Sequence, residues 1–358
     1  MTRLIRARID GAALQSNLKL IRTRAPHSRV MAVVKANAYG HGLLPTALAL
    51  IDADAFGVAR LGEAIMLREA GLKHRIVLLE GVFDAAQLVE SARYELDLVI
   101  HQPVQIELLE AFYGPGAWSL WLKEDTGMNR LGFRPEEFRA VWQRLCALRP
   151  APAQLRVLTH LACSEELDNS MTAEQLARLR PLIEGLQVEL SIANSAAILA
   201  CPQSHADWVR PGLALYGISP FAAQTGSALG LRAAMTLESN VIALREVPLG
   251  ERVGYGGTWQ AQRRSRLAIV AAGYGDGLPR SLPNGTPVLI GGRRASLAGR
   301  VSMDMIAVDV TDLPPVRVGE RVELWGTQLA VEELSAAAGT IPHELLCGVS
   351  QRVPIELV

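Results

Sequence analysis

Short apolar strands alternate with amphipathic helices along the first two thirds of the chain, and this alternation limits the possible folds most strongly. We predict eight strands, at residues 30–34, 55–59, 76–80, 96–101, 119–123, 155–160, 188–193 and 208–216. Helical patterns occupy residues 11–24 and, between the strands, for example 63–70, 85–92 and 172–186. Eight strand–helix units over roughly 190 residues predict a TIM-like (β/α)8 barrel of the α/β class. A doubly wound open sheet is the alternative, but no G-x-G-x-x-G fingerprint follows an early strand.

After Pro220 the pattern changes to β-like runs separated by glycine and proline turns. These runs cover residues 236–246, 266–271, 286–290, 305–310 and 321–324, with a single helix at about 331–338. Such spacing is typical of a mostly-β domain. We therefore predict a barrel over residues 10–225 and a mostly-β C-terminal domain over residues 226–358, to which the strand at residues 2–9 is expected to add.

Charge and cysteine content exclude several classes of function. Lysine plus arginine and aspartate plus glutamate number 36 each, so the net charge of zero argues against nucleic acid as a partner. Cys146, Cys163, Cys201 and Cys347 are scattered without metal-site spacing, which favours reduced thiols in a cytoplasmic protein and no bound metal. The N-terminus lacks the apolar segment of a signal peptide, and no run reaches membrane-spanning length.

Lys35 ends an apolar strand and precedes a polar, glycine-bearing loop that contains Tyr39 and His41. A partly desolvated environment disfavours the ammonium form and lowers the pKa of the amine, so that a neutral, nucleophilic amine becomes available. This is the chemistry of a Schiff-base lysine. On spacing alone, a lysine that reaches solvent at a strand end, beside two ordinary loop residues, explains the pattern as well.

Further polar residues lie on or just after other predicted barrel strands. Lys123 and His160 end the fifth and sixth strands, Asn194 and Ser195 follow the seventh, and Arg210 lies within the eighth. In a barrel the C-terminal ends of the strands form one rim, where function concentrates. Each residue alone is an ordinary strand-end polar group, but together with Lys35 they favour an active site.

Several strings of the chain resemble the alanine racemase family. They lie at residues 33–42, 123–133, 210–217, 253–259, 273–277 and 299–305, and the resemblance covers essentially the whole chain. The first resembles the attachment signature for pyridoxal 5'-phosphate. The resemblance implies an alanine racemase that interconverts L-alanine and D-alanine with this cofactor on Lys35, for peptidoglycan synthesis or alanine catabolism.

The resemblance also implies roles for residues around the cofactor. Arg130 would bind the cofactor phenolate and the substrate carboxylate, oriented by a carbamylated Lys123. Arg210 would face the pyridine nitrogen. Because arginine stays protonated, that nitrogen would remain unprotonated, and transamination and decarboxylation would be limited. Candidate phosphate ligands are Tyr39, Asn194, Ser195, Gly212 and Leu213. Some relatives carry a tyrosine where this chain has Gln351, so the resemblance does not extend to a phosphate contact from that position.

Racemisation needs a base on each face of the α-carbon. By resemblance, Lys35 serves one face and Tyr255 of the other subunit of a homodimer serves the second. His160 would link Arg210 with Tyr255. Tyr274, Met303 and Asp304 would line the partner's substrate pocket and entrance.

Three rival functions remain. A broad-specificity amino-acid racemase or serine racemase of the same fold is the nearest. A barrel that decarboxylates basic amino acids is disfavoured by Arg210. A pyridoxal-phosphate carrier built from a lone barrel is disfavoured by the domain that carries Tyr255.

Overall fold

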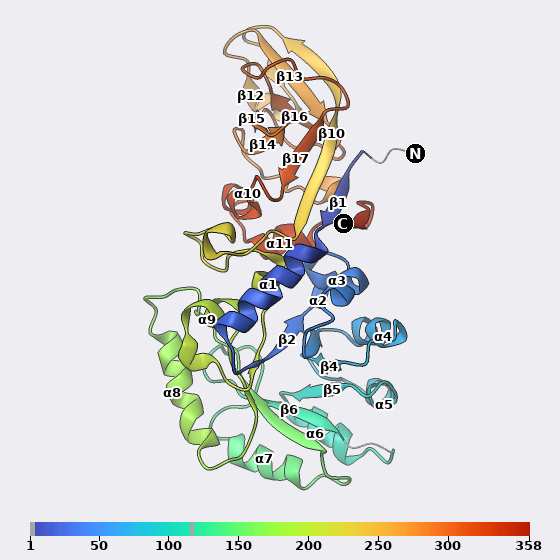
Figure 1. Cartoon of the computed structure of the whole chain (residues 1–358), viewed down its shortest axis with the longest axis vertical. Coiled ribbons are helices and arrows are strands. Elements are labelled where there is room, and N and C mark those ends of the chain that lie inside the picture. Colours follow the sequence, from blue (N-terminus) through green and yellow to red (C-terminus); the bar gives the residue numbers. More distant parts are fainter. Residues whose placement is uncertain (1–3, 115–117) are drawn as a thin grey trace. The chain divides into compact units, whose positions relative to one another are not determined.

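The computed structural model describes residues 4–114 and 118–358, and the chain divides into two compact units (Figure 1). We call residues 15–38 and 43–215 the barrel unit. We call the remainder, residues 4–14, 39–42 and 216–358, the β unit. Residues 39–42, shortly after Lys35, therefore belong to the β unit, although the lysine itself belongs to the barrel unit.

The barrel unit contains a closed barrel of parallel strands. Its strands are β2 (Arg29–Val33), β3 (Ala55–Val58), β4 (Arg75–Leu78), β5 (Asp97–Ile100), β6 (Ser119–Lys123), β7 (Gln154–Leu158), β8 (Leu190–Ser191) and β9 (Trp208–Val209). Each strand pairs in parallel with the next, and β9 pairs with β2. The closure confirms the predicted (β/α)8 barrel and excludes the open sheet.

Helices connect the strands, as the alternation predicts. They are α1 (Gly11–Arg24), α2 (Lys35–Tyr39), α3 (Leu43–Ala49), α4 (Leu61–Glu69), α5 (Ala85–Arg93), α6 (Pro103–Glu110), α7 (Phe138–Cys146), α8 (Met171–Ile183) and α9 (Ser195–Ala200). Asp84 caps α5, where its carboxylate accepts a hydrogen bond from the Gln87 amide. Predicted and observed helices differ by a few residues at their ends.

The predicted strand at residues 208–216 is wrong over most of its length. Only Trp208–Val209 forms β9, and the 3-10 helix η2 (Leu213–Tyr216) follows. Proline has no amide hydrogen to donate, so Pro211 cannot extend the strand ladder. The apolar residues that follow it are buried in a helical turn, and periodicity alone does not distinguish such a run from a strand.

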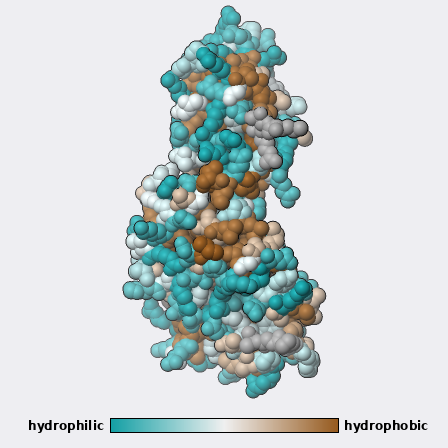
Figure 2. Space-filling model, turned by 45° about the vertical axis from the view of Figure 1, so that its right-hand side comes forward, coloured by the Kyte–Doolittle hydropathy of each residue, from teal (hydrophilic) through white to brown (hydrophobic). Residues whose placement is uncertain are grey.

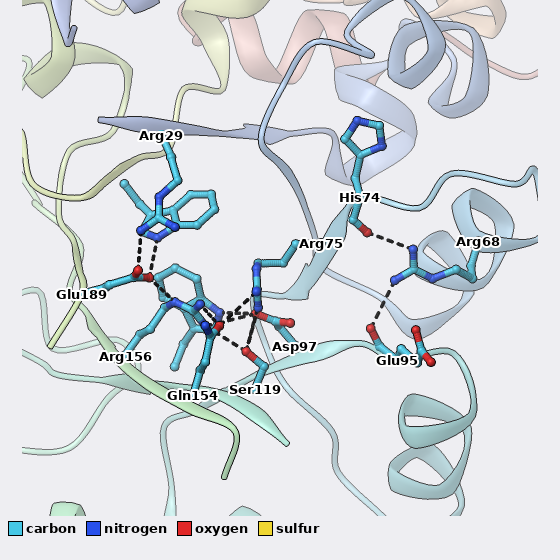
Figure 3. Close-up of polar contacts among 12 residues, drawn as sticks. Arg29, Arg68, His74, Arg75, Glu95, Asp97, Ser119, Gln154, Arg156 and Glu189 are labelled. Atoms are coloured by element: carbon cyan, nitrogen blue, oxygen red, sulfur yellow. Dashed lines mark hydrogen bonds and ion pairs between the residues drawn. The ribbon is translucent and has the colours of Figure 1, made fainter. Parts of the chain in front are cut away.

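One end of the barrel interior is filled by a polar network, which Figure 3 shows in close-up. The side chains of Arg75 and Arg156 both approach Asp97, with nitrogen–oxygen distances of 2.5 and 3.8 Å. Both arginines also donate to the Ser119 hydroxyl, at 2.7 and 2.8 Å. Arg75, Asp97 and Ser119 are the first residues of β4, β5 and β6, so the network lies at the end of the barrel opposite Lys35.

Glu189 joins this network just before β8. It accepts hydrogen bonds from Arg156 and from the Trp208 indole, at 2.5 and 3.0 Å, and pairs with Arg29 at 2.5 Å. Burial alone would raise the pKa of Glu189, but the hydrogen bonds from Arg29, Arg156 and Trp208 outweigh it and lower the pKa to about 2. The ionised carboxylate therefore stabilises the fold.

The stability that Glu189 contributes should depend on pH. Its pKa is lower in the folded chain than in the unfolded chain, where it is about 4.3. The contribution is therefore fully present above the unfolded value and is lost as pH falls toward 2. Glu189→Gln should lower the melting temperature at pH 7. Below pH 4.5 the melting temperature of this variant should fall less steeply than that of the wild type. Glu184→Gln, at an exposed position, is the matched control. The same dependence of melting temperature on pH in the two variants would contradict this role.

The β unit is built on an antiparallel sheet. Its strands are β1 (Arg6–Ile9), β10 (Met235–Val247), β13 (Ser265–Val270), β14 (Pro287–Ile290), β15 (Arg293–Leu297), β16 (Ile306–Asp309), β17 (Arg321–Trp325) and β18 (Ile355–Leu357), beside a small pair formed by β11 (Arg252–Val253) and β12 (Trp259–Gln260). The long strand β10 pairs with both β13 and β17, so the sheet closes on itself. Strand β1 adds to the edge of β10, with Ala7 opposite Leu237.

Two α-helices interrupt the described residues of the β unit after β17, where the sequence predicts one. α10 (Val331–Ala338) occupies the predicted range, and α11 (Pro342–Cys347) is additional. Pro342 begins α11, as proline often does at the first position of a helix. The helix has only 6 residues, so its apolar residues show no clear helical period in the sequence. Within the described ranges, none of the helices has the length and apolar character needed to cross a membrane.

Candidate active site

Lys35 follows β2 and begins a left-handed turn of the backbone. Ala36, Asn37, Ala38 and Tyr39 have φ angles between 52° and 54°. Left-handed helical backbone costs roughly 1–2 kcal/mol per non-glycine residue. Strain of this kind persists where the surrounding structure enforces it, often at functional sites. The sequence predicts only a polar loop here, so the turn is a finding of the structure.

Backbone hydrogen bonds hold both sides of Lys35. The amides of Val33 and Val34 donate to the carbonyls of Pro211 and Gly57, at 3.0 and 2.9 Å. After the lysine, the Asn37 carboxamide oxygen accepts from the Leu43 amide at 2.8 Å. Three parts of the barrel unit therefore hold the chain on the two sides of Lys35.

Lys123 ends β6 and is buried. Burial lowers its pKa most, and the charges of Arg210, Arg130 and Lys35 lower it further, to about 8. Charges shift a pKa in this way only when they are near. Lys35 and three of the predicted partners therefore gather at one end of the barrel, and Lys123 carries a neutral amine more often than an exposed lysine does.

Arg210 follows β9 and is buried by the barrel unit. Its terminal nitrogens donate to the Ser191 hydroxyl at 2.6 Å and to the Thr159 carbonyl at 2.5 Å. Burial lowers the pKa of Arg210 to about 10, so the guanidinium remains charged at neutral pH. Ser191 and Thr159 hold this side chain in place, and the sequence analysis missed both.

His160 accepts a hydrogen bond from Arg210 on Nδ1, at 3.4 Å. Burial lowers its pKa well below the usual value, and the neighbouring charges of Arg210, Lys123 and Arg130 add to the shift. The imidazole is therefore neutral at pH 7. Because Nδ1 accepts, the proton of this tautomer lies on Nε2 and can be donated.

Four predicted phosphate ligands lie together in the barrel unit. The Ser195 hydroxyl oxygen accepts hydrogen bonds from the amides of Gly212 and Ala214, at 2.9 and 3.2 Å, on either side of Leu213. Asn194 caps α9, with its side-chain oxygen 3.1 Å from the Ala197 amide. Hydroxyl and amide donors of this kind can bind a phosphate without a positive side chain.

Tyr39, the fifth predicted phosphate ligand, belongs to the β unit. Its ring stacks on Tyr216 with 4.8 Å between centroids and lies 5.7 Å from the ring of His343. Burial, and secondarily Cys347, raises the pKa of Tyr39 above that of a free tyrosine. The hydroxyl therefore keeps its proton and can act as a hydrogen-bond donor.

Arg130 is exposed, on a loop that folds back along β6. Phe133 and Lys123 are joined by a backbone hydrogen bond of 3.0 Å, and the Asp125 carboxylate accepts from the amides of Gly127 and Asn129, each at 3.0 Å. This compact loop carries Arg130 within electrostatic range of Lys123, as the sequence predicts.

Glu124 is a buried acid that the sequence analysis missed. It is 1% exposed, and its two carboxylate oxygens have no hydrogen-bond partner among the described residues. Burial raises its pKa to about 8, and the charges of Asp125, Glu137 and Glu136 add to the shift. The side chain is therefore mostly protonated at neutral pH, and its burial costs stability.

Replacing Glu124 by methionine should stabilise the protein by about 1–3 kcal/mol, since it removes an unsatisfied buried polar group. In the wild type the folded pKa lies above the unfolded value, so unfolding releases a proton. Stability should then fall as pH rises from about 5 to 8, and Glu124→Met should remove this decline. Urea unfolding at several pH values measures it. The exposed Glu136→Met is the control, and equal stability of the two variants would disprove the assignment.

The predicted residues of the β unit lie on neighbouring loops. Tyr274 and Gly275 donate their amides to the carbonyls of Ser302 and Met303, at 3.0 and 2.8 Å. A side-chain carbon added to Gly254 would lie 3.5 Å from the Arg300 amide nitrogen. The loop that carries Tyr255 therefore lies beside the segment that leads to Ser302 and Met303.

These β-unit side chains are also unusually exposed. Tyr255 is 66% exposed, Met303 53% and Tyr274 40%. Figure 2 shows hydrophobic side chains among polar ones on the surface of the molecule. Large apolar groups gathered on adjoining loops are typical of a surface that binds a partner.

Comparisons with known proteins agree across the chain. The family model described as "Alanine racemase, N-terminal domain" matches residues 9–220, and "Alanine racemase, C-terminal domain" matches residues 234–357. A curated alanine racemase from Shewanella amazonensis is 47% identical over 356 residues, 98% of each chain. One from Nitrosospira multiformis is 48% identical over 99% of each chain.

Solved structures give the same result. The chain superposes on a biosynthetic alanine racemase from Pseudomonas aeruginosa with a TM-score of 0.97 and 47% identity, over all of both chains. An alanine racemase from Bartonella henselae with covalently bound pyridoxal phosphate matches with a TM-score of 0.89 and 31% identity, over 100% of this chain and 99% of that one.

Proposed function

The chain belongs to the alanine racemase family, and we propose that it interconverts L-alanine and D-alanine with pyridoxal 5'-phosphate bound at the mouth of its barrel. The observation that carries this proposal is that the cations Lys35, Lys123, Arg130 and Arg210 gather with the neutral His160 at one end of the barrel, where the cations lower the pKa of their neighbours. A structural barrel has no need for so many cations at one rim.

The residues present fit the cofactor. Lys35 would bind it covalently, and the donors around Ser195, Gly212 and Leu213, beside Asn194, would hold its phosphate. Arg210 would face the ring nitrogen as a donor that keeps its own proton. When bound, the cofactor withdraws electrons from the α-carbon and makes its proton removable.

The proton is then moved by two side chains of this protein. Lys35 would serve one face of the α-carbon, and Tyr255 of a second subunit would serve the other. We propose a homodimer with shared sites, which the exposure of Tyr255, Tyr274 and Met303 supports. His160, neutral and able to donate from Nε2, would connect Arg210 with that tyrosine.

Arg130 would hold the substrate carboxylate. For this it needs a partner that fixes its position, and Lys123 can become one by reaction with carbon dioxide. The neutral amine forms an N–C bond to carbon dioxide and releases one proton, which leaves a carbamate anion. The lowered pKa of Lys123 supports this modification.

Met303, Asp304 and Tyr274 would complete the substrate pocket of the partner subunit. A narrow gate of Tyr255 and Tyr274 would restrict that pocket to a small side chain. The product would serve peptidoglycan synthesis or alanine catabolism, and the scattered cysteines favour the cytoplasm.

A chiral assay tests the proposed substrate. Purified protein with added pyridoxal phosphate is incubated with L-alanine, L-serine, L-lysine or L-arginine, and the D-isomer is measured. Alanine should turn over much faster than the others. Comparable turnover of serine or of the basic amino acids would favour the broad-specificity alternative, and no D-alanine would refute the proposal.

A further inference from the structure

We propose that Arg352 is a positioning residue, which fixes the loops that carry Tyr274 and Met303 in the β unit. This inference rests on the proposed function, in which those loops form the substrate pocket. Arg352 lies next to Gln351, where this chain departs from relatives that carry a tyrosine.

Arg352 joins two loops that are far from it and from each other in sequence. Its Nε donates to Asp276 Oδ1 at 2.7 Å, and its Nη1 pairs with Asp304 Oδ1 at 2.8 Å. Its Nη2 lies 3.4 Å from the Met303 carbonyl oxygen. A planar guanidinium can make these contacts together, whereas a lysine amine cannot.

Asp276 is the anchor of this arrangement because it is buried. Its second carboxylate oxygen accepts from the Gly273 amide at 2.8 Å, which fixes the start of the Tyr274 loop. Removal of Arg352 would leave this buried carboxylate without its cation, which is costly. The pair with Asp304 is exposed and contributes little stability by itself, so its effect is on the position of the loop.

The loops also fit together at their glycines. A side-chain carbon at Gly275 would lie 2.8 Å from Arg352 Nη2, and one at Gly273 would lie 2.3 Å from the Met303 carbonyl oxygen. One at Gly277 would lie 2.4 Å from the carbonyl oxygen of Gly348. With such close packing, a small movement of Arg352 displaces both substrate loops.

The test compares Arg352→Ala and Arg352→Lys with Arg294→Ala. Arg294 forms an ion pair with Glu333 elsewhere in the β unit, so its removal controls for loss of an ion pair. Arg352→Ala should raise the KM for alanine about tenfold, because displaced binding groups lose much of their effect, while kcat changes less. Amide hydrogen exchange should accelerate at residues 273–277 and 302–305. Arg352→Lys, which keeps one contact to Asp276, should fall between wild type and alanine in both measurements.

Two outcomes separate the claims. If wild type racemises alanine and Arg352→Ala shows the KM of Arg294→Ala, Arg352 is merely structural and the inference is wrong, even if exchange changes. If wild type does not racemise alanine, the proposed function fails, and the role in substrate binding fails with it. Unchanged exchange in the two loops would refute the positioning itself.

Discussion

Lys35→Ala should lose racemase activity by a factor of about 10⁴ or more, because in the proposed mechanism one side chain would supply both the covalent link to the cofactor and one of the two bases. The visible absorbance of cofactor bound to the lysine should disappear as well. Spectra and a chiral assay of the same preparation measure both effects.

The exposed Lys19→Ala is the matched control, since it removes a lysine from the surface of α1. It should keep both the absorbance and the activity. Full racemase activity in Lys35→Ala would show that the site has been assigned to the wrong amine.

Tyr255→Phe should slow racemisation by about 10²–10⁴, the usual contribution of a positioned acid or base. The value of kcat/KM falls by the same factor in both directions, because L-alanine and D-alanine are mirror images with an equilibrium constant of one. The roles of the two bases therefore become visible only in proton exchange. In deuterated water, D-alanine should still exchange its α-proton through Lys35, and L-alanine should exchange far more slowly.

Tyr113→Phe removes the hydroxyl of a fully exposed tyrosine and should change neither rate. Equal loss of exchange from the two enantiomers in Tyr255→Phe would contradict a mechanism with one base on each face.

The barrel was predictable because its strands are short and apolar, and because apolar residues recur with helical period in the segments between them. Strand β6 matches its predicted range of 119–123, and α1 matches 11–24. Residues 208–216 were not predictable, since an apolar run buried on all sides looks the same in a strand and in a 3-10 helix.

The candidate site residues that lie at the ends of barrel strands were predictable. Lys35, Lys123, His160 and Arg210 follow from that rule and from the resemblance to the family. Their supports did not follow, because contacts such as Arg210 to Thr159 join residues 51 positions apart. No periodic pattern records such a contact. The left-handed turn after Lys35 was equally hidden, since its residues are not glycines.

Subunit mixing tests the central claim, that each active site takes Lys35 from one chain and Tyr255 from another. Lys35→Ala and Tyr255→Phe dimers are mixed in equal amounts, dissociated and allowed to reassociate. Half of the dimers then carry both variants, and in a shared-site dimer each of these has one intact site, which predicts about a quarter of wild-type activity. Activity no greater than the sum of the separate variants would mean that both bases come from the same chain, and would contradict the account.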